Sequence, residues 1–127
     1  MMLDPYTDRE PIFLSDNNVL TINSPVKANI QELDIMFNNL EELIENKSYV
    51  YVLLNLSESE RPNAEVREYL KLRLNRVKHK FRHISVYTGA NILLSAAVLF
   101  MLGFGGVGSY SVHHTIEACL EKFNNAG

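Results

Sequence analysis

The residues best suited to binding or catalysis follow the apolar segment 49–56, in a polar loop that leads into a helix. Glu58 and Glu60 could serve as a general acid and base if their surroundings differed enough. Loop carboxylates are more often simply solvated. Because open α/β sheets usually meet ligands at the carboxyl ends of their strands, we predict a partner-binding surface here. Its predicted residues are Glu58, Glu60, Arg61, Asn63, Arg67 and Lys71.

The histidines and the single cysteine offer other chemistry. His79 and His83 are four residues apart, as two zinc ligands on a helix can be, but no H-E-x-x-H pattern and no nearby cysteine accompany them. We therefore expect two exposed histidines at a helix end and no metal. His113 and His114 precede the last predicted helix, which contains Cys119. A Cys–His nucleophile would need convergence and an orienting group, so we expect Cys119 to be a small core residue.

Residues 103–108 read G-F-G-G-V-G, which matches the dinucleotide-binding pattern G-x-G-x-x-G. That motif requires a strand before it and a helix after it, so that the pyrophosphate meets a helix N-terminus. Here the predicted order is reversed, with an apolar helix before the glycines and a strand after them. The glycines are therefore predicted to end a helix and allow a tight turn, and no cofactor is expected.

Positive charge is concentrated in and around the second predicted helix. Of the 12 lysines and arginines, eight lie between residues 61 and 82. They are Arg61, Arg67, Lys71, Arg73, Arg76, Lys78, Lys80 and Arg82. A solvated face whose charge suits the helix dipole is the ordinary interpretation, and an anionic partner is the alternative. Because the chain has a net charge of −3 and no interleaved aromatic platform, no nucleic-acid partner is expected.

The predicted third helix, 92–102, is apolar almost all round. Such a helix is buried or meets something apolar, and this one is too short to span a bilayer. It could be packed on both sides by its own domain. Alternatively, it leaves a surface for a symmetric dimer, a lipid or another apolar ligand. The candidate residues for that surface are Leu93, Leu94, Ala97, Val98, Met101 and Phe104.

Hydrophobic periodicity predicts an α/β fold with a mixed five-stranded sheet and four helices. The predicted strands are 12–14, 19–22, 49–56, 84–88 and 110–112, and the predicted helices are 30–44, 62–81, 92–102 and 115–123. The first two strands form a hairpin that adds an antiparallel edge. The later strands alternate with helices and should be parallel, with 49–56 as the central strand.

Composition favours one globular domain over residues 1–127, with a core at about 10–123 and fraying ends. The chain has 127 residues, of which 46% are hydrophobic. With one cysteine, no internal disulfide can form, which fits a reducing compartment. The first residues have neither a basic start nor an apolar run, so no signal peptide is expected. We therefore predict a cytoplasmic protein.

Several segments resemble STAS-like domains, in particular the bacterial STAS/SEC14-like branch related to sporulation anti-sigma-factor antagonists. The resemblance covers roughly residues 10–123. It rests on the order of elements and on segments 50–57, 61–67, 86–91 and 110–120. It implies a non-enzymatic regulatory module that binds another protein, such as a kinase-like anti-sigma factor.

The resemblance also implies a region for phosphorylation and an alternative, ligand-binding function. Antagonists that switch by phosphorylation carry a serine after the central strand, usually within an Asp-Ser pair. Ser57 and Ser59 occupy that region here, but Asn55 ends the strand and no Asp-Ser pair follows. The SEC14-like character implies an alternative function, namely binding of a lipid or apolar small molecule, or of a membrane surface, by residues 92–104.

Overall fold

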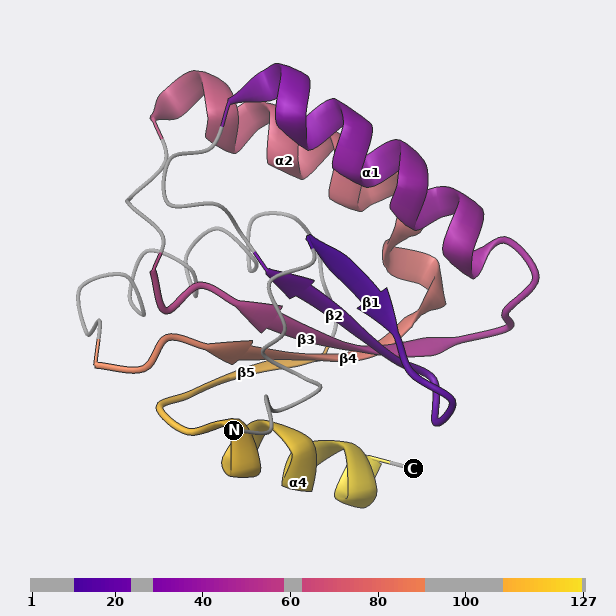
Figure 1. Cartoon of the computed structure of the whole chain (residues 1–127), viewed down its shortest axis with the longest axis vertical. Coiled ribbons are helices and arrows are strands. Elements are labelled where there is room, and N and C mark those ends of the chain that lie inside the picture. The colour runs from indigo at the N-terminus through magenta and orange to yellow at the C-terminus, as the bar shows by residue number, and fades with distance from the viewer. Residues whose placement is uncertain (1–10, 24–28, 59–62, 91–108, 127) are drawn as a thin grey trace, which may run out of the picture.

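A five-stranded sheet forms the centre of the molecule. The computed structural model describes residues 11–23, 29–58, 63–90 and 109–126. The strands are β1 (Ile12–Leu14), β2 (Val19–Asn23), β3 (Val50–Asn55), β4 (Phe81–Tyr87) and β5 (Tyr110–His113). They lie side by side in sequence order (Figure 1). Strand β1 is antiparallel to β2 and the other neighbours are parallel, which confirms the predicted mixed sheet with β3 at its centre.

The predicted hairpin between β1 and β2 is confirmed. Its turn contains Asn18, whose φ of 65° lies in the left-handed region that asparagine tolerates better than most residues. The Ser15 amide donates to the Val19 carbonyl at 3.0 Å and closes the turn. This register places the side chains of Leu20 and Ile22 in the main core.

The described residues contain three α-helices where the sequence predicted four for the whole chain. They are α1 (Ile30–Ile44), α2 (Ala64–Val77), which continues into the 3-10 turn Lys78–Lys80, and α4 (Ile116–Ala126). The predicted helix 92–102 lies outside the described residues. Asparagine caps begin the first two helices: Asn29 accepts from the Glu32 amide at 2.9 Å, and Asn63 accepts from the Val66 amide at 2.8 Å. No helix in the described ranges is long and apolar enough to span a bilayer.

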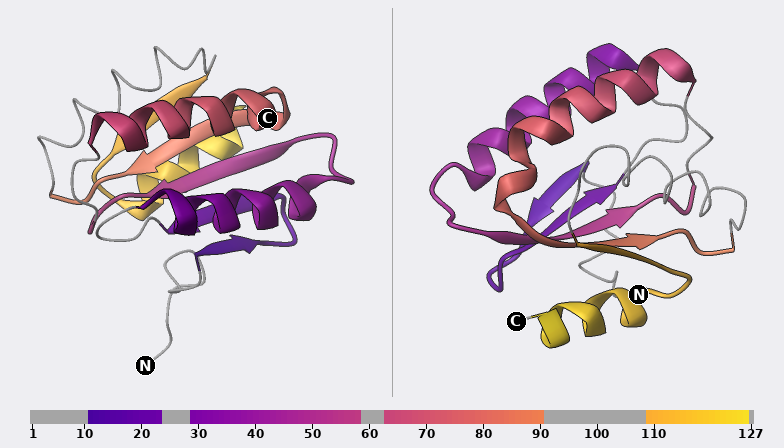
Figure 2. Two further views of the ribbon diagram at one scale, coloured as in Figure 1. Left: turned by 90° about the horizontal axis from the view of Figure 1, so that it is seen from above. Right: turned by 180° about the vertical axis from the view of Figure 1, so that it is seen from behind.

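The helices form two unequal layers on the sheet. Helices α1 and α2 cover one face together, and α4 lies against the other (Figures 1 and 2). Under α1 and α2 the core is apolar, and Leu40, Val50 and Val86 in it are fully buried. A smaller cluster under α4 includes Tyr51 and Phe123, whose rings stack with centroids 5.2 Å apart.

Strand β4 begins at Phe81 rather than at the predicted Ile84. The 3-10 turn ends the helix early, and the Lys80 ammonium fixes this turn by donating to the Ile44 and Glu45 carbonyls at 2.8 and 2.9 Å. His83 is therefore a strand residue. It is only 5% exposed, so the expectation of an exposed histidine at a helix end is wrong for it.

Candidate functional site

The carboxyl ends of four parallel strands form one row of polar side chains. Asn23 pairs with Asn55, Asn55 with Tyr87, and Tyr87 with His113. Since residues in one row of a sheet point to the same side, all four side chains lie on the face that α4 covers. This row borders the predicted partner-binding surface and gives it a rigid base.

A side-chain turn shapes the exit of β3. The Asn55 carboxamide oxygen accepts from the Ser57 amide at 3.1 Å and from its hydroxyl at 2.7 Å, while the Asn55 amide nitrogen donates to Asn23 at 2.9 Å. Gly89, with φ of +59°, passes beside this turn, and a Cβ there would lie 3.4 Å from the Ser57 Cβ. Asn55 thus holds the half-buried Ser57 in one place.

Four residues of the predicted binding surface are among the described residues. Glu58 is exposed beyond the turn, and Asn63 is both exposed and the cap of α2. Arg67 is half-buried, and Lys71 forms an ion pair with Glu68 at 3.2 Å. The remaining candidates of this surface, Ser59, Glu60 and Arg61, lie outside the described residues. So do the apolar candidates Leu93, Leu94, Ala97, Val98, Met101 and Phe104.

Several cations of the basic segment point into the protein. Arg73 is 3% exposed, and its guanidinium binds Asp34 at 2.7 Å, Asn38 at 2.9 Å and Glu41 at 2.9 Å. It also lies 5.2 Å from the centre of the Phe37 ring. The expectation of a solvated charged face is therefore wrong for Arg73, which joins α2 to α1.

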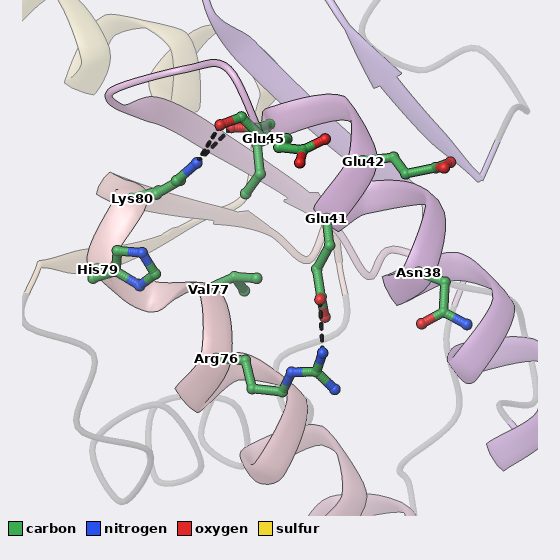
Figure 3. A pocket seen from close by; sticks show the side chains of 9 residues that line it. Asn38, Glu41, Glu42, Glu45, Arg76, Val77, His79 and Lys80 are labelled. Carbon is green, nitrogen blue, oxygen red and sulfur yellow. Dashed lines mark hydrogen bonds and ion pairs between the residues drawn. The ribbon is translucent and has the colours of Figure 1, made fainter.

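A groove of about 400 Å³ lies between the C-terminal ends of α1 and α2 (Figure 3). Its lining mixes both charges: Glu41 and Glu42 come from α1 and Glu45 from its C-cap, and Glu41 points towards Arg76. Arg76 binds Glu41 at 2.9 Å, and Lys80 binds α1 carbonyls. The polar groups that line the groove link the two helices to each other and so stabilise the helix layer.

The sequence analysis missed a hydrogen-bonded run of serine and histidine side chains under α4. Ser109 contacts His83 Nδ1 at 2.7 Å, His83 Nε2 contacts Ser111 Oγ at 2.8 Å, and Ser111 Oγ contacts His113 Nε2 at 2.6 Å. We call these four residues the Ser–His chain. Their alternation at positions 109, 111 and 113 was the available signal, because residues two apart in a strand share a face.

The environment of the Ser–His chain disfavours positive charge. Burial lowers the pKa of His83, and the nearby charges of Lys122 and His113 lower it further. Burial likewise lowers the pKa of His113, with added effects from Lys122 and His114. The charges that act on both imidazoles in the described part of the chain are thus cationic.

Cys119 is fully buried, which confirms that it is a core residue. Burial raises the pKa of its thiol to about 12. Its carbonyl accepts from the Ser85 hydroxyl at 3.0 Å, which fixes α4 on β4. Since the thiolate is the nucleophilic form, this residue is unsuited to the Cys–His chemistry considered from the sequence.

The part of the chain that the structure describes holds no group of three or more histidine, cysteine or carboxylate side chains that could bind a metal ion. Comparisons with protein-family models, with curated proteins and with solved structures found no match to this chain.

Proposed function

We propose that the chain is a non-enzymatic regulatory module of the STAS-like type that binds another protein. The proposed contact surface is the exit of β3 together with the first turns of α2. It contains Ser57, Glu58, Asn63, Arg67 and Lys71 among the described residues. A kinase-like anti-sigma factor is the partner implied by the sequence resemblance, and a second copy of the chain is the other candidate.

The observation that carries this proposal is the fixed turn at the carboxyl end of the central strand. Asn55 holds the amide and hydroxyl of Ser57, and Asn63 holds the first turn of α2. A surface that is ordered before binding loses less conformational entropy when a partner arrives. Protein partners of open α/β domains are also expected at this edge of the sheet.

The chemistry of this surface suits a protein partner of mixed charge. The exposed carboxylate of Glu58 follows the exit of β3, and Arg67 and Lys71 lie in the first turns of α2. Complementary charges at such a surface would mainly set specificity and the rate of association. Burial of Cys119 fits the proposed non-enzymatic function, because it keeps the thiol away from any substrate.

A matched pair of charge reversals tests the proposed surface. Arg67→Glu lies on it, whereas Arg82→Glu makes the same change at the amino end of β4, where Arg82 is exposed and stacks on Tyr49. Binding to candidate kinase-like anti-sigma factors should be measured by calorimetry. We expect Arg67→Glu to weaken binding about tenfold or more and Arg82→Glu to leave it within about twofold. Equal effects, or no complex with the wild-type chain, would contradict the proposal.

Phosphorylation is a separate test on the same surface. The active partner and ATP would be incubated with the chain, and the peptide that spans residues 50–67 would be analysed by mass spectrometry. The resemblance predicts modification at Ser57 or Ser59. Native mass spectrometry of the freshly expressed protein distinguishes the alternative function, because a co-purified lipid would favour an apolar ligand bound by residues 92–104.

A further inference from the structure

The Ser–His chain can hold a limited number of protons. The Ser111 hydroxyl has one proton, so it can donate to one imidazole while it accepts an N–H from the other. Two neutral histidines satisfy this pattern in either direction along the chain. One added proton is also accommodated, because a charged His83 would donate to both Ser109 and Ser111 while Ser111 still donates to His113.

A second added proton breaks the pattern. Both Nε2 atoms would then carry hydrogen and point at the same Ser111 oxygen, at 2.8 and 2.6 Å. The Ser111 proton would lose its imidazole acceptor, and two like charges would be separated by one oxygen atom. A buried group that loses its hydrogen-bond partner destabilises the fold, and close like charges do so as well.

The groups that pack around the Ser–His chain do not compensate the charge of two protonated histidines. Helix α4 contributes Lys122, Cys119 and the ring of Phe123, which meets the His83 ring edge-on at 6.2 Å between centroids. Strand β3 contributes the neutral Tyr51 under the same Phe123 ring. Beyond β5, His114 acts on His113 and donates from Nδ1 to the Gly89 carbonyl at 2.9 Å.

We propose that the Ser–His chain is a proton-sensitive latch, which holds α4 on the sheet near neutral pH and releases it in acid. Helix α4 is the element that depends on it, because Phe123 packs directly on His83. The α1–α2 layer on the opposite face has no part of the latch. Release would expose the Ser–His chain together with the small apolar cluster around Tyr51 and Leu53, while α1 and α2 stay packed on the opposite face.

The sign of the pH dependence follows from the lowered pKa of each histidine. When α4 is detached or the protein is unfolded, His83 and His113 would take up protons below the ordinary pKa of 6.5. While α4 is docked, both histidines resist protonation, because their pKa values are lowered. The stability of docking is therefore fully present above that pH. It is lost as the pH falls from that value towards the lower pKa values of the docked state.

Hydrogen–deuterium exchange on the full chain tests the latch at about pH 7.5 and about pH 5, after correction for intrinsic exchange rates. We expect residues 116–126 to lose protection about tenfold or more in acid, the equivalent of one pKa unit. Residues 30–44 of α1 should change less than about twofold. Unchanged protection of α4, or an equal loss in α1, would overturn the proposal.

Two variants separate the latch from general acid instability. His113→Gln keeps a hydrogen-bonding group without a titrating one, so it should abolish most of the acid response of α4. Lys122→Glu changes only an exposed residue and replaces the cation near both imidazoles, so it should also reduce the response. Lys47→Glu, in the connection between α1 and β3, is the charge-matched control and should respond like the wild type. An undiminished response in Lys122→Glu would overturn the latch even if His113→Gln failed to fold.

Discussion

The two faces of the sheet are built from different kinds of side chain. Facing α1 and α2, the inner strands present aliphatic residues such as Leu20, Val52 and Val86. On the face that α4 covers, strands β4 and β5 and the residue before β5 carry Ser85 and the Ser–His chain. One face gains stability from apolar burial, which is insensitive to pH. The other combines a small apolar cluster that includes Leu53 and Phe123 with hydrogen bonds whose strength changes with protonation.

The largest expected effect lies on the aliphatic face. Leu40 is a fully buried residue of α1, so Leu40→Ala should lower the free energy of unfolding by about 3 kcal/mol through lost transfer energy and a cavity. The matched change on α4 is Leu120→Ala, a partly buried position that should cost about 1 kcal/mol. Urea denaturation measures both. Equal losses would refute the claim that the aliphatic face dominates stability.

Arg73→Ala should have the next largest effect, about 2 kcal/mol in the free energy of unfolding. The guanidinium is 3% exposed, and its loss removes ion pairs to Asp34 and Glu41, although Asp34 is about half exposed and can be rehydrated. Arg76→Ala is the exposed control and should cost about 0.5 kcal/mol. If the two variants unfolded at the same urea concentration, Arg73 would not be the main link between the helices.

Ser111→Ala should cost about 1 kcal/mol near neutral pH, because two imidazole nitrogens lose their shared partner. Ser48→Ala is a matched change at an exposed position and should be close to neutral. Thermal unfolding monitored by circular dichroism suffices to compare them. A Ser111→Ala protein as stable as Ser48→Ala would show that the polar face contributes nothing to stability.

The smallest expected effect is at Lys71, whose ion pair with Glu68 lies at the surface of α2. Lys71→Ala should change the free energy of unfolding by about 0.3 kcal/mol, because exposed ion pairs are screened by water and salt. Chemical denaturation in low and high salt checks this value. If Lys71→Ala lowered the free energy of unfolding as much as Arg73→Ala, a surface ion pair would contribute as much to stability as the buried ion pairs between the helices.

The aliphatic face could be predicted from the sequence because its pattern is local. The spacing of Leu33, Phe37, Leu40 and Ile44 identified α1, and the continuous apolar run at 50–54 identified the central strand. The hairpin was predictable from the turn residues around Asn18. Each of these features is encoded within one element.

The missed features depend on residues far apart in the chain. Arg73 is buried because Asp34 and Glu41 on α1 reach it, and their distance in sequence hides this from helical periodicity. The Ser–His chain requires β4 and β5 to pair in the observed register. The Asn55 turn depends on side-chain hydrogen bonds to Ser57 and to Asn23 on β2, which the pattern of a single strand does not predict.

The sequential order of the strands has a consequence for biosynthesis. Because each of the strands β2 to β5 pairs with the strand that precedes it in the chain, a nascent polypeptide can extend the sheet one strand at a time as it leaves the ribosome. Helix α4 follows all five strands in the chain, so the face that it covers stays open until α4 has been made. In this order of assembly, α1 and α2 can pack on the sheet first, and α4 then docks on a sheet that has already formed.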